Sequence, residues 1–468
     1  MVKRQIVKNI SFSFCANLLS FLVSIFMVMF VPKFLSIDEY GKWQLFLFYM
    51  TYLGVFTFGW RDGIYLRYAG DKLENLNKSC FSGQIYSYVL LMIMVSLCMI
   101  LLNVNFIRDP VKKEILLGVA VILPLYNFEG LCSSILQMTN CIKKYAGLIA
   151  VERGTLLLLI LVFLFLGARD YESMYSSNLI ALAIASTFGV FACHVLFTTH
   201  LPTSKLVTME ALENIKVGIQ LLAANIVGFF IIGIVRFGIS AEWDVSTFGK
   251  VSLVLSLSNF LMVFIDSVSV VFFPLLKHID LKKLGAVYIK GRLFLSVIVL
   301  GILLFYYPAK LIFSFWLPQY SESFAYMAIL FPVCVYESRF SLLINTYLKA
   351  IRREGLILKI NIISITVSCF ATMLTVYVMH NIHLAIISVI FLYAFRCELA
   401  ENYLMKILKI NIIRDLITDN CMVLIFILTG FLIDNWGCTI AYGCVYFMYL
   451  LFNKQHIVKI IGKTRLRR

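Results

Sequence analysis

The segment Pro124-Leu-Tyr-Asn-Phe-Glu-Gly130 has a counterpart 208 residues later, Pro332-Val-Cys-Val-Tyr-Glu-Ser338. Both segments place a proline, an aromatic residue, a glutamate and a small residue at the same intervals. The same spacing, without a gap, relates two further pairs of segments, which are 147–149 with 355–357 and 40–42 with 248–250. A repeat of this length in a very apolar chain predicts two equivalent halves, as in many transporters.

The composition predicts a polytopic α-helical membrane protein. Of the 468 residues, 61% are hydrophobic and only 14% are charged, whereas a soluble protein carries about 25% charged residues. The apolar runs are continuous over about 20 residues or more, which excludes the short alternating segments of a transmembrane β-barrel. The twelve cysteines contain no C-x-x-C pair, and neither H-E-x-x-H nor a phosphate-binding G-x-x-x-x-G-K-[ST] motif is present. We therefore expect no metal site and no ATP-driven pump, and a secondary transporter fits better.

The apolar runs predict about fourteen transmembrane helices. These cover residues 11–33, 41–65, 81–106, 114–138, 145–168, 172–198, 215–240, 248–276, 289–316, 322–348, 354–379, 383–405, 415–433 and 436–453. Adding 208 to the first six spans gives the next six to within a few residues. The sequence therefore predicts a six-helix lobe over residues 1–205, a second over 206–410, and two extra helices with a basic tail over 411–468.

The formal charge of +16 comes from 41 Lys and Arg against 25 Asp and Glu. In a soluble protein this surplus would suggest nucleic acid as the partner. Here Lys and Arg are concentrated in alternate loops, which predicts that these loops and both termini are cytoplasmic. Each half then begins on the same side of the membrane, so the two lobes are predicted to be parallel repeats. An anionic substrate is a second use for part of the basic surplus.

Acidic groups inside the predicted helices are the first candidates for function, because an ionisable group costs about 3 kcal/mol in the hydrocarbon region. Glu129 and Glu337 occupy matching places in the repeat, and Asp266 lies in the eighth predicted helix. We interpret these three as candidates for coupling to Na⁺ or H⁺, or for lining a cavity. The alternative for the glutamates is a structural hydrogen bond that fixes the bend at each proline.

Basic groups are the second set of candidates. Arg61, Arg153, Arg236 and Arg339 are candidates for binding an anionic lipid head group, because guanidinium forms bidentate bonds to phosphate. The alternatives are an internal ion pair, such as Arg339 with Glu337, and an Arg61 or Arg236 side chain that reaches the membrane interface. For the remaining charged residues near the end of the twelfth helix, local pairing is expected: Arg396, Glu398 and Glu401.

Several loose motifs resemble one family over nearly the whole chain. They are Lys8-Asn9-Ile10, Phe34-Leu35-Ser36-x-x-Glu39-Tyr40-Gly41, Lys143-Lys144-Tyr145, and the stretch from Gly218 to Arg236-Phe237. With these motifs the chain resembles bacterial polysaccharide flippases, the O-antigen and capsule repeat-unit translocases of the multidrug/oligosaccharidyl-lipid/polysaccharide exporter superfamily.

The resemblance implies two six-helix lobes around a central cavity, with the last two helices outside. It also implies that an undecaprenyl-pyrophosphate-linked oligosaccharide crosses the bacterial inner membrane by alternating access, in a lipopolysaccharide or related polysaccharide pathway. No cofactor and no enzymatic activity are expected, and polysaccharide polymerase and chain-length proteins are expected partners. The alternatives are a peptidoglycan lipid-precursor flippase, a drug/cation antiporter of the same superfamily, and a membrane polysaccharide polymerase. The last of these usually needs a large extracytoplasmic loop, which the sequence lacks.

Overall fold

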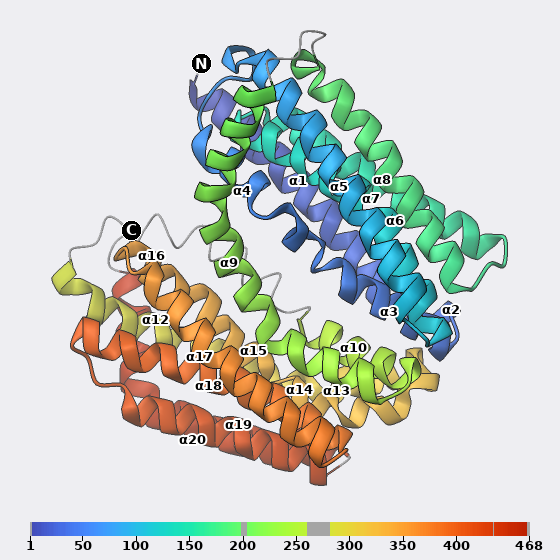
Figure 1. The fold of residues 1–468 in the computed structure, drawn as a ribbon. Helices are drawn as coiled ribbons and strands as arrows, with labels where there is room; N and C mark the ends of the chain where they lie inside the picture. The colour runs from blue at the N-terminus through green and yellow to red at the C-terminus, as the bar shows by residue number, and fades with distance from the viewer. Residues whose placement is uncertain (1, 198–203, 260–280, 434, 466–468) are drawn as a thin grey trace. The chain divides into compact units, whose positions relative to one another are not determined.

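The computed structural model describes residues 2–197, 204–259, 281–433 and 435–465. Within these residues the chain is helical and contains no β-strand, which confirms the predicted fold class (Figure 1). The chain divides into two compact units, Met1–Ile226 and Val227–Arg468. The predicted lobe boundaries after residues 205 and 410 concern the sequence repeat and stay predictions. Each unit is described below by itself.

The first unit is built around four long helices that pack along one another, α5 to α8. Its elements are α1 (Val2–Met29), α2 (Val31–Phe34), α3 (Ile37–Met50), a 3-10 turn (Leu53–Thr57), α4 (Trp60–Arg67), a 3-10 turn (Leu73–Asn75), α5 (Lys78–Phe106), α6 (Pro110–Met138), α7 (Ile142–Phe165), α8 (Tyr171–Ala192), a 3-10 turn (His194–Leu196) and the first part of α9 (Ser204–Glu242).

The second unit contains the rest of α9 and the helices that follow it. These are α10 (Val245–Asn259), α12 (Leu281–Ile302), a 3-10 turn (Leu303–Phe305), α13 (Tyr306–Trp316), a 3-10 segment (Pro318–Ala325), α14 (Met327–Leu330), α15 (Val333–Ser338), a π-helix (Arg339–Asn345), α16 (Thr346–Ala350), α17 (Glu354–Thr372), a π-helix (Met373–Val378), α18 (Ile382–Leu408), α19 (Ile413–Leu432) and α20 (Trp436–Arg465). Pro332 lies at the break between α14 and α15, whereas Pro124 lies inside the continuous helix α6.

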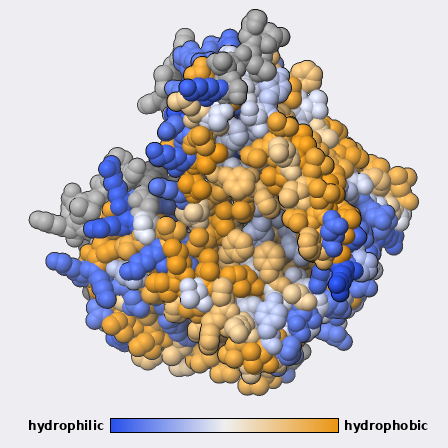
Figure 2. Space-filling model, viewed as in Figure 1, coloured by the Kyte–Doolittle hydropathy of each residue, from blue (hydrophilic) through white to orange (hydrophobic). Residues whose placement is uncertain are grey.

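Eleven helices among the described residues are long and apolar enough to cross a membrane. Large apolar side chains remain exposed on them, such as Phe165 and Phe315, each at 89%. Figure 2 shows such side chains over much of the face in view. Since such a surface is stable only against lipid, the chain is a multi-pass membrane protein.

The three other predicted spans differ from this set for separate reasons. The span predicted at 248–276 is described only as far as residue 259, and its helix Val245–Ser258 is short. The span predicted at 436–453 is helical in α20 but includes three tyrosines. The span predicted at 41–65 as one helix was wrong, because α3 ends at Met50 and α4 begins only at Trp60.

The break before α4 permits a very close crossing of α4 and α9. Gly59 has a positive φ of 80°, and it forms a small-x-x-x-small pair with Gly63. A Cβ atom on Gly63 would lie 1.8 Å from the Asn214 carbonyl oxygen, and one on Gly218 would lie 1.9 Å from the Gly59 carbonyl oxygen. Backbone therefore packs on backbone here, and no larger side chain fits without moving a helix.

The family-like motif at 34–41 holds two helix starts together. The Ser36 side chain accepts a hydrogen bond from the Glu39 backbone N–H at 3.2 Å and begins α3. The Glu39 carboxylate accepts one from the Tyr171 N–H at 2.6 Å, at the start of α8. Asp244, 208 residues after Ser36, caps α10 in the same way through the Thr247 N–H. The motif therefore has a structural use in capping.

The two C-terminal helices pack on α12 within the second unit. From α20, the Tyr442 hydroxyl donates to the Leu300 carbonyl at 3.0 Å, and the Tyr446 hydroxyl donates to the Val297 carbonyl at 2.7 Å. From α19, Asp419 accepts a hydrogen bond from Ser296 at 3.0 Å. These contacts make the pair an integral part of this unit.

Candidate functional sites

Glu129 lies in the first unit on α6, five residues after Pro124, in a cluster of four charged side chains. It is half-buried and interacts electrostatically with Glu152 and Arg153 of α7 and with Arg61 of α4. Glu152 and Arg153 form an ion pair of 3.7 Å. Three helices thus bring two carboxylates and two guanidinium groups together, and three of the four are residues that the sequence analysis selected.

Arg61 reaches this cluster because residue 130 has no side chain. A Cβ atom on Gly130 would lie only 2.5 Å from the Arg61 Nη1 atom. The small residue beside Glu129 is therefore the place where a guanidinium packs, and Arg61 reaches into the unit instead of ending at the interface with Asp62.

Arg153 is the accessible cation of the Glu129 cluster. Its side chain is 42% exposed, whereas that of Glu152 is 16% exposed. An exposed guanidinium beside less exposed carboxylates can bind an anionic group, while the carboxylates can hold a proton or a cation. The repeat did not single out Glu152, because residue 360 at the matching place is isoleucine.

Glu337 lies in the second unit on α15, where it forms an ion pair with Arg396 of α18. The Arg396 Nη1 atom is 3.5 Å from the Glu337 Oε2 atom. The Arg396 Nε–H donates to the Asn361 Oδ1 atom at 3.1 Å. The guanidinium carbon lies 3.7 Å from the centre of the Phe340 ring. The expected alternative pair of Glu337 with Arg339 is therefore replaced by a pair with Arg396.

Asn361 is the repeat counterpart of Arg153, since the two positions are 208 apart. Arg153 interacts directly with Glu129, whereas Asn361 is linked to Glu337 through Arg396. Arg396 was expected to pair locally on its own helix, and this was wrong. Glu398 is two residues away, and residues two apart on a helix point to different sides. The repeat itself was the signal that could have found Asn361.

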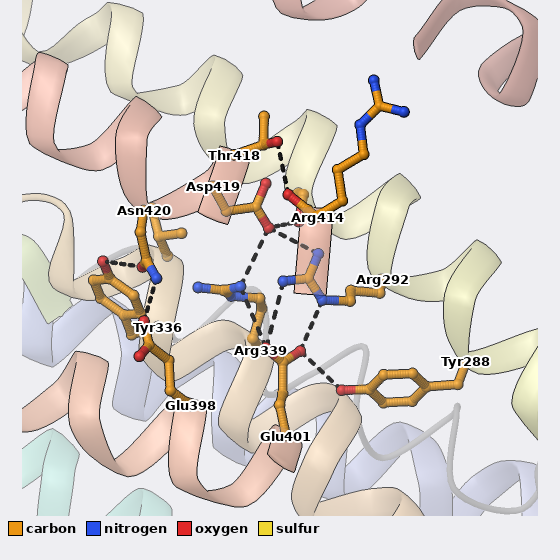
Figure 3. A network of polar contacts seen from close by, with 12 residues as sticks. Tyr288, Arg292, Tyr336, Arg339, Glu398, Glu401, Arg414, Thr418, Asp419 and Asn420 are labelled. Carbon is orange, nitrogen blue, oxygen red and sulfur yellow. Dashed lines mark hydrogen bonds and ion pairs between the residues drawn. The ribbon is translucent and has the colours of Figure 1, made fainter. Parts of the chain in front are cut away.

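Arg339 lies in a separate, fully buried network. It is 3.2 Å from Asp419 and 3.6 Å from Glu401. Arg292 of α12 contacts the same two carboxylates, at 2.9 Å and 2.8 Å respectively. In Figure 3 both guanidinium groups lie between the two carboxylates.

The charges of this network balance, and none of the four side chains is more than 2% exposed. The Tyr288 hydroxyl also donates to Glu401 at 2.9 Å. Beside the network, Tyr336 and Glu398 both hydrogen-bond to Asn420, which gives α19 a second polar contact (Figure 3). The burial and balance favour a structural role for Arg339. Arg292, which was not among the candidates chosen from the sequence, points into the unit from α12.

Arg236 of α9 is held by α10. Its Nη2 donates to the Ser252 hydroxyl at 2.9 Å, and its guanidinium carbon lies 5.1 Å from the centre of the Phe248 ring. This arrangement differs from an arginine that reaches the interface. Asp266 lies outside the described residues. Among the residues that are described, no group of three or more His, Cys, Asp or Glu is arranged to hold a metal ion.

Comparisons with known proteins agree with this architecture. No family model and no curated protein sequence matches the chain. Among solved structures, the chain is similar to the lipid II flippase MurJ in an inward closed conformation, with a TM-score of 0.65 and 14% identity, over 96% of this chain and 100% of MurJ. It is also similar to an inward-facing multidrug resistance MATE family transporter of the MOP superfamily, with a TM-score of 0.59 and 14% identity, over 84% of this chain and 95% of the transporter. The chain therefore has the fold of MOP superfamily transporters.

Proposed function

We propose that the chain is a flippase that moves an undecaprenyl-pyrophosphate-linked oligosaccharide repeat unit across the bacterial inner membrane by alternating access. The fold supports the transporter part of this proposal. The observation that carries the substrate class is the mixture of guanidinium and carboxylate groups around the two repeated glutamates. A drug/cation antiporter would place mainly acidic groups there, whereas a diphosphate needs cations.

In this proposal Arg153, with Arg61 beside it, contacts the substrate diphosphate. Arg236 and Arg339 keep the structural contacts that hold them, and Asp266 stays a candidate for ion coupling. Glu129 and Glu152 are two carboxylates in one cluster, and sharing a proton or Na⁺ between them would relieve their repulsion. Both termini are cytoplasmic, and the polysaccharide polymerase and chain-length proteins act after translocation.

The test is deletion of the gene in its native host. We expect loss of the surface polysaccharide and accumulation of lipid-linked repeat units that a membrane-impermeant glycan-modifying enzyme cannot reach from the periplasm. Complementation with Arg153→Lys should restore more export than complementation with Arg153→Ala. Normal surface polysaccharide in the deletion strain would refute the proposal.

A second candidate is a flippase for a peptidoglycan lipid precursor, favoured by the similarity to a lipid II flippase over the full length of that protein. The same strain separates the two candidates. Loss of a peptidoglycan precursor flippase causes lysis and accumulation of precursor with a peptide, whereas loss of a repeat-unit flippase spares the cell wall. We place this candidate second because the sequence motifs resemble the polysaccharide exporters.

A further inference from the structure

We propose that Arg396 is a second anion-binding residue for the lipid-linked diphosphate and that Glu337 is its internal competitor. This inference rests on the proposed function and adds a residue from the twelfth helix. Glu337 holds Arg396 when no substrate is bound, and a diphosphate oxygen takes the place of its carboxylate. No covalent bond forms or breaks.

The first support is that Arg396 is held in a defined orientation. Asn361 accepts its Nε–H at 3.1 Å, and the guanidinium carbon lies 3.7 Å from the centre of the Phe340 ring. Phe340 belongs to the π-helix Arg339–Asn345 that follows α15 directly, and π-helical turns are frequent at functional sites. A guanidinium fixed at one edge and one face loses little freedom when it binds an anion.

The second support is a glycine of α9 that lies beside the guanidinium. The contacts to Asn361 and Glu337 use Nε and Nη1. On the α9 side the neighbour is Gly228, and a Cβ atom there would lie 3.9 Å from Nη2. The Asn361 Nδ2 atom lies 3.7 Å from the same Cβ position, so a larger residue at 228 would pack against both side chains and hinder an anion that binds Nη2.

The third support is that the pair is accessible and its contact is loose. The side chains of Arg396 and Glu337 are 12% and 25% exposed, whereas those of Arg292 and Glu401 are 2% and 0% exposed. The separation of 3.5 Å in the Arg396–Glu337 pair is longer than the 2.8 Å of Arg292–Glu401. A partly exposed and loose pair costs less to separate than a buried one.

The charges around the pair leave Glu337 as the group that competes with an anion for Arg396. Glu337 and Arg396 both interact electrostatically with Tyr393 of α18, as does Arg236 of α9. Glu337 also acts on Cys397 of α18. Among these described neighbours, Glu337 is the carboxylate paired with Arg396. Neutralising it leaves the guanidinium as the charged group that an anion meets.

The experiment is titration of the purified full-length protein in detergent with farnesyl diphosphate, followed by calorimetry. We expect Arg396→Ala to weaken binding by about tenfold or more, because a charge-assisted bond contributes about 1.5–3 kcal/mol. We expect Glu337→Gln to strengthen binding by several-fold, because the competitor is gone. A solely structural pair would make both variants bind more weakly.

Two further variants keep the result interpretable. Arg353→Ala removes an exposed arginine of the same unit and should leave binding unchanged. Gly228→Leu should weaken binding while thermal unfolding in detergent stays close to that of the wild type. If Arg396→Ala unfolds like the wild type and binds as well, the inference is wrong. The deletion phenotype tests the proposed function independently, so the two can fail separately.

Discussion

Glu129 and Glu337 are matched by the repeat but differ in what surrounds them. Glu129 shares its cluster with a second carboxylate, Glu152, and with two arginines. Among the described residues, Glu337 pairs with one arginine, Arg396 of α18. The matching helix of the first unit, α8, supplies no arginine to the Glu129 cluster. The two units therefore share the carboxylate and its small neighbour at the repeat spacing, while the arginines that contact each carboxylate come from different helices. Equal positions need not have equal roles in transport.

The same contrast is stronger at positions 84 and 292, which are also 208 apart. In the first unit the buried Gln84 accepts hydrogen bonds from Trp60 at 3.2 Å and from Asn214 at 2.6 Å. In the second unit Arg292 joins the buried charge network, and Asp419 from α19 supplies one of the two carboxylates. The extra helix pair thus balances a charge that the first unit does not contain.

The largest effect should come from removing this difference. Arg292→Gln gives the second unit the residue of the first and leaves two buried carboxylates with only Arg339. We expect a loss of stability of about 3–5 kcal/mol, because one partner of a buried pair is removed. Thermal unfolding of the purified protein in detergent measures it.

Gln84→Leu is the matched control in the first unit. It leaves neutral donors without an acceptor and should cost less, about 1–3 kcal/mol. Equal losses of stability in the two variants would show that the charge of the network contributes little to stability. The two units would then differ in residue type but not in the energy of their buried contacts.

The sequence alone predicted the features that follow from periodicity and from the repeat. The helical class is an example. Prediction failed where a contact depends on how helices are turned toward each other. Arg396 was grouped with Glu398 and Glu401 because these lie close in sequence, but its partners come from α15 and α17. Asp419 lies inside the predicted span 415–433 and was not selected, because the sequence does not show that α19 turns it toward Arg292 and Arg339.

The break between α3 and α4 was missed for a related reason. Residues 51–59 are apolar enough to continue a helix, so hydropathy gave no signal. Gly59 and Gly63 were the available signal, because two glycines four residues apart permit a close helix crossing. The need for that crossing comes from Gly218 of α9, which is distant in the sequence.

An intermediate effect is expected from neutralising each glutamate in turn. Glu129→Gln and Glu337→Gln should each reduce export of surface polysaccharide by about tenfold, which corresponds to about 1.4 kcal/mol in the barrier. Under the two proposals the reasons differ, since Glu129→Gln would remove a coupling carboxylate and Glu337→Gln would retain the diphosphate too tightly.

Quantitative surface-glycan assays, with immunoblots for protein level, measure both effects. Diphosphate binding then sharpens the comparison, because only Glu337→Gln should bind more tightly. If both variants export normally, neither glutamate has a role in transport and the repeat preserves a structural device.

The smallest effect should come from the small residues beside the glutamates. A methyl group on Gly130 would lie 2.5 Å from the Arg61 Nη1 atom. Because this atom is at the end of a flexible side chain, Gly130→Ala should move the guanidinium away from Glu129 without unfolding the unit. We expect export to fall by about two- to threefold, equivalent to about 0.5 kcal/mol.

Ser338→Ala is the counterpart of this change in the second unit. The Ser338 hydroxyl donates to the Val335 carbonyl of its own helix at 3.0 Å, so its loss should leave Arg396 in place and export unchanged. Equal export by the two variants would show that the position of Arg61 does not matter to transport. A fall confined to Gly130→Ala would mean that the small residue is needed in the first unit because an arginine packs against it.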